Sequence, residues 1–189
     1  MSGFGELMKI RRSVRDYEDR KVPFEVVREI ITDACEAPSG GNRQPWAFVV
    51  VSDARMIRRL SDESKKNLLS DENAMKSPIL RLYRPVLSDE GFNVFYNAPC
   101  LVYITGPKDL RSAAADCSLA AAYFMLSAAG RGLGTCWVEL GSSIRNPETL
   151  QTLGIPDDHR IMATIILGYP RSVPERPPRN EPRILAVIE

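Results

Sequence analysis

Three arginines and a serine near the amino terminus have the residue types of an anion-binding segment. Arg11, Arg12 and Arg15 lie within five residues, and Ser13 stands between them. Guanidinium groups bind phosphate through paired N–H donors, and a serine hydroxyl adds a further hydrogen bond. The same residues could also form a solvated basic face at the end of a short helix. The segment therefore predicts either a phosphate site or a solvent-exposed basic turn.

A second polar cluster occupies residues 37–46, between an apolar helical pattern and an apolar strand pattern. Pro38 should end the helix, and Gly40 with Gly41 would let the backbone approach a bound group closely. The neutral donors and acceptors of the cluster are Ser39, Asn42 and Gln44. Such side chains suit the edge of a heterocycle. The alternative is an ordinary helix-to-strand loop with Trp46 in the core, because these residue types are common in loops.

A glycine-rich run follows a long apolar helical pattern. Gly130, Gly132 and Gly134 alternate with other residues, which suggests a nucleotide-binding loop. The dinucleotide fingerprint requires a strand before the glycines and a helix after them, and this run does not meet that requirement. The glycines more simply end the helix and turn the chain into a short strand. The residues that follow are Cys136, Trp137, Val138 and Glu139.

Taken in order, these segments resemble the nitroreductase family of flavin enzymes. That family carries Arg-Arg-Ser-x-Arg, then Ala-Pro-Ser-x-x-Asn-x-Gln-Pro-Trp, and later Gly-Leu-Gly-Thr-x-Trp, and all three motifs are present here. An Ala-Pro pair before the apolar run 100–105 and a Gly-Tyr-Pro after the run 161–167 extend the likeness. The resemblance covers roughly residues 5–60 and 95–183, and it leaves the middle of the chain outside.

The resemblance implies a homodimer that binds FMN at its interface. One subunit would supply the arginine motif, with Arg11 and Arg15 on the ribityl phosphate and Arg12 nearer the ribityl chain or the ring edge. The other subunit would supply the loop within 37–46. Arg179 is the expected phosphate ligand from the late chain, with Arg183 as its competitor. The implied cofactor-binding residues are Arg11, Arg12, Ser13, Arg15, Pro38, Ser39, Gly40, Asn42, Gln44, Cys136, Trp137, Val138, Glu139 and Arg179.

The resemblance also implies a reaction. N5 of FMN would accept hydride from NAD(P)H and pass electrons to a nitroaromatic, a quinone or a similar small acceptor. No side chain is then needed as a catalytic nucleophile, and no metal is expected. The family also contains dehalogenating and flavin-cleaving enzymes, so these reactions are alternatives. Two further hypotheses are a flavin- or nucleotide-binding regulatory protein without turnover, and a cysteine redox protein. The sequence favours neither NADH nor NADPH.

Composition argues against several other classes. The chain has 189 residues, 44% of them hydrophobic, which predicts one domain over 1–189. Its net charge of +1 argues against a nucleic-acid binder. No apolar run approaches the ~20 residues of a membrane helix, and the first residues lack the apolar region of a signal peptide. A cytoplasmic protein without membrane contact is expected. The cysteines are Cys35, Cys100, Cys117 and Cys136. Their scattered positions predict reduced thiols and disfavour zinc or iron–sulfur sites.

The elements that must position these segments alternate between helical and strand patterns. They predict an α+β fold with a central, mainly antiparallel sheet wrapped by helices. The expected helices are 3–12, 24–35, one from Met56 into the polar stretch 61–76, 113–130 with Asp109 or Ser112 as cap, and 144–153. The expected strands are 47–52, 100–105, a short strand after Gly134, 161–167 and 184–188.

Three segments are interpreted through the resemblance. Residues 61–97 would form a variable lid or a dimer-facing excursion that shapes the substrate pocket. The small-residue helix over 113–129 would lie either at a dimer interface or in the core. Residues 171–189 would form an extended arm. Its apolar end, 184–188, would pair with the partner subunit, because a bare apolar strand promotes aggregation.

Overall fold

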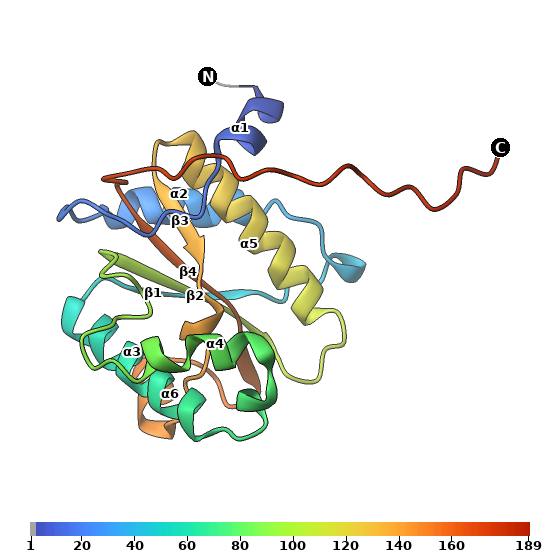
Figure 1. The fold of residues 1–189 in the computed structure, drawn as a ribbon. Helices are drawn as coiled ribbons and strands as arrows, with labels where there is room; N and C mark the ends of the chain where they lie inside the picture. Colours follow the sequence, from blue (N-terminus) through green and yellow to red (C-terminus); the bar gives the residue numbers. More distant parts are fainter. Residues whose placement is uncertain (1–2) are drawn as a thin grey trace.

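A computed structural model describes residues 3–189, and Figure 1 shows how its elements are arranged. The sheet contains β1 (Ala47–Val51), β2 (Cys100–Pro107), β3 (Gly134–Trp137) and β4 (His159–Gly168). The strands lie in the order β1-β2-β4-β3, and every neighbouring pair is antiparallel. The predicted α+β fold with a mainly antiparallel sheet is confirmed.

The strand β2, one of the two interior strands, is apolar on both faces because both faces of the sheet are covered. Leu101 and Tyr103 belong to one core cluster, whereas Val102 and Ile104 belong to the other. Successive side chains of a strand point to opposite faces, so each core takes every second residue. A strand buried on both faces has a continuous apolar sequence, which is why this run was predictable.

Helices cover both faces of the sheet (Figure 1). α2 (Phe24–Ala34) and α5 (Ala113–Gly130) pack on one face, and α3 (Ala54–Ser70) packs on the other. Asp53 caps α3, because its carboxylate accepts a hydrogen bond of 2.7 Å from the N–H of Met56. α3 ends at Ser70 and not at residue 76 as predicted, since the next residue has extended backbone angles.

Shorter elements complete the structure. They are α1 (Phe4–Ile10), α4 (Pro78–Leu87), α6 (Pro147–Thr152) and single 3₁₀ turns at Gly40–Asn42, Ala74–Lys76 and Glu139–Gly141. Ser112 stands at the cap position of α5, as predicted, but its side chain makes no capping hydrogen bond. α4 lies inside the segment that was interpreted as a lid.

Within residues 3–189, α5 is the one helix long and apolar enough to cross a membrane. This differs from the expectation that no apolar run reaches that length. Core helices of globular proteins meet the same criterion. Ala120, Ala121 and Phe124 are fully buried and share a core cluster with α2 and the sheet. One side of α5 is therefore a core face, whereas Leu119 and Tyr123 on the helix are each 41% exposed.

The chain leaves the sheet after β4 as an extended arm (Figure 1). Residues 172–189 have no regular secondary structure. The arm is tied to the body near its start, where the N–H of Arg171 donates to the carbonyl of Asp16. Ile184, Leu185, Val187 and Ile188 are 73–94% exposed. The strand predicted over 184–188 does not form within a single chain, because no sheet edge lies against it.

Candidate functional site

The arginine motif is fixed to the edge of the sheet beside β3. Ser13 forms an isolated parallel bridge with Thr135, and the N–H of Val14 donates to the carbonyl of Thr135 at 2.9 Å. A glycine is required opposite, since a Cβ on Gly134 would lie 2.8 Å from three atoms of the buried Val14 side chain. The first and third predicted segments are therefore in contact, although they are far apart in the sequence.

Four arginines gather at one end of this motif. Burial and then the charges of Arg176, Arg11 and Arg179 lower the pKa of the Arg12 guanidinium. Arg12 also donates to the carbonyl oxygens of Lys9 and Arg11 at the end of α1. Within residues 3–189, no carboxylate forms an ion pair with any of the four arginines. A cluster of like charges without a counter-charge is an electrostatically favourable place for an anion.

A small cavity adjoins the arginine cluster. It has a volume of about 210 Å³, and Arg11, Arg12, Thr135 and Pro170 are among the residues that line it. The hydroxyl of Thr135 is buried and has no hydrogen-bond partner within residues 3–189. A buried polar atom without a partner is uncommon in a folded protein. The cavity thus offers the guanidinium donors of Arg11 and Arg12, which a phosphate ester would use, whereas the Thr135 hydroxyl is fully buried.

A second, larger cavity lies on the other side of the motif. Its volume is about 440 Å³, and it is lined by Arg15, Tyr83, Tyr96 and residues 136–140. It therefore brings together the predicted residues Cys136, Trp137, Val138 and Glu139. The Trp137 indole donates to the Glu139 carboxylate at 3.0 Å. The N–H of Val138 donates to the carbonyl of Thr164, so this particular N–H is not available to a ligand.

Arg15 belongs to the larger cavity and not to the arginine cluster. Its guanidinium carbon lies 5.6 Å from the centre of the Tyr96 ring. Arg15 is absent from the charges that act on Arg12. Arg11 lies between the two cavities, because its charge acts both on Arg12 and on the Cys136 thiol. The charges of Arg11 and Arg15 both act on the Cys136 thiol, but Arg11 lines the smaller cavity and Arg15 the larger one. Their pairing on one phosphate stays a prediction.

The loop within 37–46 lies at the opposite end of α5. The N–H of Gly40 donates to the buried carboxylate of Asp116 in the first turns of α5, at 3.0 Å. The arginine motif is near the last turn of α5, where Leu7 approaches Gly130. At 1.5 Å per residue, Asp116 and Gly130 are about 21 Å apart along the helix axis. One chain therefore does not bring the two predicted halves of the site together.

Side chains of this loop partly satisfy one another. Ser39 Oγ accepts from the N–H of Gln44, and Asn42 Oδ1 accepts from the Gln44 amide, each at 3.0 Å. Asn42 and Gln44 have φ angles of 54° and 46°, in the region that non-glycine residues rarely adopt. Pro38 precedes these residues and follows the end of α2. Strain of this kind occurs at binding sites, which favours a functional loop over an ordinary connection.

Sequence reasoning missed four residues of these sites. Arg176 was missed because it lies in a proline-rich tail with no helical or strand pattern. Thr135 and Tyr96 became visible only through their packing. Asp116 left a signal that was overlooked, since it is a lone acid in an otherwise apolar helix.

All four cysteines are free. Burial raises the pKa of Cys100 to about 12, and burial together with the charge of Asp116 raises the pKa of Cys117 to about 11. Within residues 3–189, no three histidine, cysteine or acidic side chains converge in a way that could hold a metal ion.

The chain is similar to proteins of one family over most of its length. The family model described as Nitroreductase family matches residues 8–169, a span that includes the segment 61–97. A protein of Archaeoglobus fulgidus provisionally named NADH dehydrogenase/NAD(P)H nitroreductase is 29% identical over 168 residues, with 88% of this chain and 84% of that protein covered. An iodotyrosine deiodinase of Thermotoga neapolitana is 29% identical over 184 residues, with 93% of each covered.

Solved structures agree with these similarities. A nitroreductase with bound FMN from Bacteroides fragilis is 25% identical and superposes with a TM-score of 0.85, covering 99% of this chain and 100% of that chain. A structure of iodotyrosine deiodinase bound to FMN and 3-iodo-L-tyrosine is also 25% identical, with a TM-score of 0.73 and coverage of 96% and 97%.

Proposed function

Because this chain belongs to the nitroreductase family, we propose that it is an FMN-dependent oxidoreductase that passes hydride from NAD(P)H to a small organic acceptor. The observation that carries the proposal is the pair of cavities on either side of the arginine motif. One has the cations Arg11 and Arg12 in an otherwise mostly apolar lining, and the other offers aromatic and apolar walls. A flavin mononucleotide has a phosphate at one end and a planar ring at the other, so both ends find matching groups.

The residues of the two cavities suit the two ends of FMN, the phosphate and the ring. Arg11, Arg12, Arg176 and Arg179 would hold the phosphate through charge-assisted hydrogen bonds. Arg15 would face the ring, together with residues 136–139 of the larger cavity. FMN, when bound, supplies the hydride-accepting and hydride-donating centre at N5. The chain's own contributions are to anchor the phosphate, to hold the ring against β3 and to limit the access of water.

A homodimer is part of the proposal. The loop within 37–46 and the arginine motif lie at opposite ends of α5, so a partner subunit is needed to bring one loop to the other chain's motif. Apolar surface is available for such contact. Phe4 and Met8 of α1 are 66% and 53% exposed, and the apolar end of the arm is almost fully exposed.

A second candidate reaction is reductive dehalogenation of an aromatic amino acid. The similarity to iodotyrosine deiodinases over 93% of the chain favours it. Both reactions use the same flavin chemistry and differ in the acceptor. The larger cavity, with Arg15 and Glu139 among aromatic side chains, offers charged groups of both signs that could meet a zwitterion.

The visible spectrum of the purified protein tests the proposal first. The protein should be yellow and release FMN on denaturation, and it should not release FAD. Oxidation of NADH and NADPH is then followed with a quinone, a nitroaromatic or a halogenated tyrosine as the acceptor. Turnover with the first two supports the main proposal, and turnover confined to the halogenated tyrosine supports the second. A colourless protein that gains no flavin absorbance after incubation with FMN would contradict both.

A further inference from the structure

Tyr96 occupies a backbone conformation that the surrounding structure enforces. Tyr96 and Asn97 both have φ of 53°, in the left-handed region where a side chain is unfavourable. Asn93 holds the turn in place. Its carbonyl accepts from the N–H of Tyr96 at 2.8 Å, and its amide donates to Asn97 Oδ1 at 3.0 Å. Strained residues that are held by several bonds are concentrated at functional sites.

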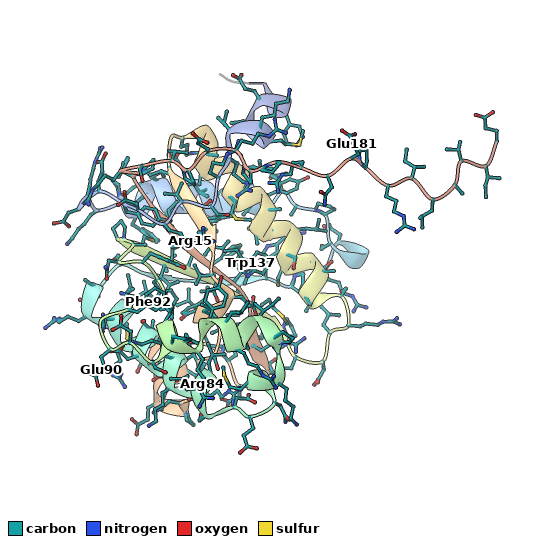
Figure 2. The ribbon with its side chains drawn as sticks, viewed as in Figure 1. Arg15, Arg84, Glu90, Phe92, Trp137 and Glu181 are labelled. Carbon is teal, nitrogen blue, oxygen red and sulfur yellow. The ribbon has the colours of Figure 1, made fainter. Side chains whose placement is uncertain are left out.

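This conformation places the Tyr96 ring in the wall of the larger cavity. The ring of Phe92 meets it edge to face at 5.7 Å between centroids, and the Arg15 guanidinium carbon lies 5.6 Å from its centre. Tyr96 is half-buried, and it lines the cavity together with Trp137 and Glu139. Figure 2 shows the position of Arg15, Phe92 and Trp137 within the fold. Tyr96 also lines a neighbouring cavity beside Asp16 and Tyr17, so it stands between the two cavities. A half-buried phenol in the wall of the larger cavity is close enough to meet an acceptor bound there.

Resting on the proposed function, we propose that Tyr96 is a catalytic residue that donates a proton to the electron acceptor during its two-electron reduction. A quinone that receives a hydride becomes a hydroquinone anion and needs one proton. In this step the O–H bond of Tyr96 breaks and an O–H bond forms on the acceptor oxygen. Tyr96 is left as a phenolate, and water then returns the proton. A nitro group that receives the hydride would take the same proton: one oxygen leaves as water, which contains the transferred hydrogen and the proton from Tyr96, and a nitroso compound remains.

The groups around Tyr96 suit both states of the phenol. Burial raises its pKa, the positive charge of Arg15 opposes that rise, and Cys136 and Tyr83 add to it. The phenol is therefore protonated near neutral pH and is able to donate. The Arg15 charge would stabilise the phenolate that forms in the step, since a cation favours the ionised form of a nearby acid. Glu139 is the remaining charged group of the cavity.

The test compares two acceptors in the FMN-loaded protein and its Tyr96→Phe variant. A quinone needs a proton with its electrons, whereas ferricyanide takes single electrons and no proton. General acid catalysis contributes about 10²–10⁴-fold to a rate, so Tyr96→Phe should slow quinone reduction by about a hundredfold or more. Reduction of ferricyanide and FMN affinity should not change. Tyr123→Phe, on the exposed side of α5 away from both cavities, is the matched control and should retain both activities.

Two measurements do not depend on the activity of the variant. In the FMN-free protein, the ionisation of tyrosines can be followed by ultraviolet absorbance as the pH is raised. The Tyr96→Phe variant should show one phenol fewer than the wild-type protein, and the missing phenol should be one that ionises above the ordinary value of about 10. Quinone reduction by the wild-type protein should be slower in heavy water, and ferricyanide reduction should not. Absence of that isotope effect, or loss of a phenol that ionises below the ordinary value, would overturn the inference.

The outcomes separate this inference from the function on which it rests. Quinone reduction by Tyr96→Phe at the wild-type rate, or an equal loss with ferricyanide, would overturn the role of Tyr96 alone. A wild-type protein that binds no FMN, or that reduces neither acceptor, would overturn the proposed function and this inference with it.

Discussion

Replacing Arg176 with alanine should weaken FMN binding without destabilising the free protein. In the absence of an anion, Arg176 contributes to repulsion among four arginines that have no acidic partner within residues 3–189. Removing one positive charge relieves that repulsion, so the melting temperature of the free protein should stay the same or rise slightly. When a phosphate is present, the same substitution removes one of its donors.

The magnitude follows from the bond that is lost. A hydrogen bond to a charged group contributes about 1.5–3 kcal/mol, which corresponds to about ten- to a hundredfold in Kd. FMN affinity should therefore fall by about that factor, whereas riboflavin, which lacks the phosphate, should bind as before. Quenching of flavin fluorescence measures both affinities. The difference between the two ligands should shrink at high salt, because screening weakens the contribution of exposed charges.

Arg183→Ala provides the matched control for this experiment. Arg183 lies on the same arm and carries the same charge, but it is not among the charges that act on Arg12. It should leave FMN affinity nearly unchanged. Equal losses of FMN and riboflavin affinity in Arg176→Ala would show that Arg176 supports the fold or the ring, and not the phosphate. Equal losses in the two variants would show that only the net charge of the arm matters.

Three further predictions concern other parts of the structure. Asp116→Ala removes the acceptor of the Gly40 N–H, so it should lower FMN affinity through the loop and reduce the melting temperature, and calorimetry with flavin titration would detect both changes. Removing residues 180–189 should change the oligomeric state or lower solubility, and an unchanged state in light scattering would contradict the exchanged arm. Alkylation near neutral pH should leave Cys100 and Cys117 unmodified in the folded protein. Their raised pKa values leave almost no thiolate, and mass spectrometry should show labelling that increases only as the pH approaches about 11.

Most of the fold was predictable because local sequence and tertiary packing agree. The run 100–105 is apolar throughout since both faces of its strand are buried, and Asp53 marks the start of α3 by a real side-chain cap. The strand over 184–188 was not found in one chain, because the arm runs away from the sheet and no strand lies against it. Pairing of this segment with a partner subunit stays a prediction.

Site residues that belong to a continuous sequence motif could be predicted. Site residues that are placed by contacts between segments far apart in the sequence could not. The arginine motif and residues 136–139 could be found by pattern, and the structure places them in contact. The position of Arg176 depends on the path of an arm that has no regular structure. Tyr96 depends on a turn held by Asn93, and nothing in its local sequence indicates a left-handed backbone.

The placement of the loop and the arginine motif at opposite ends of α5 has a genetic consequence. In a two-fold dimer each site would take one half from each chain. A chain with a damaged loop and a chain with a damaged arginine motif would each form inactive homodimers. Their mixed dimer would contain one site built from both intact halves and one site carrying both defects. Co-expression of two inactive alleles should therefore restore activity at one site per mixed dimer, a complementation that self-contained monomeric sites could not show.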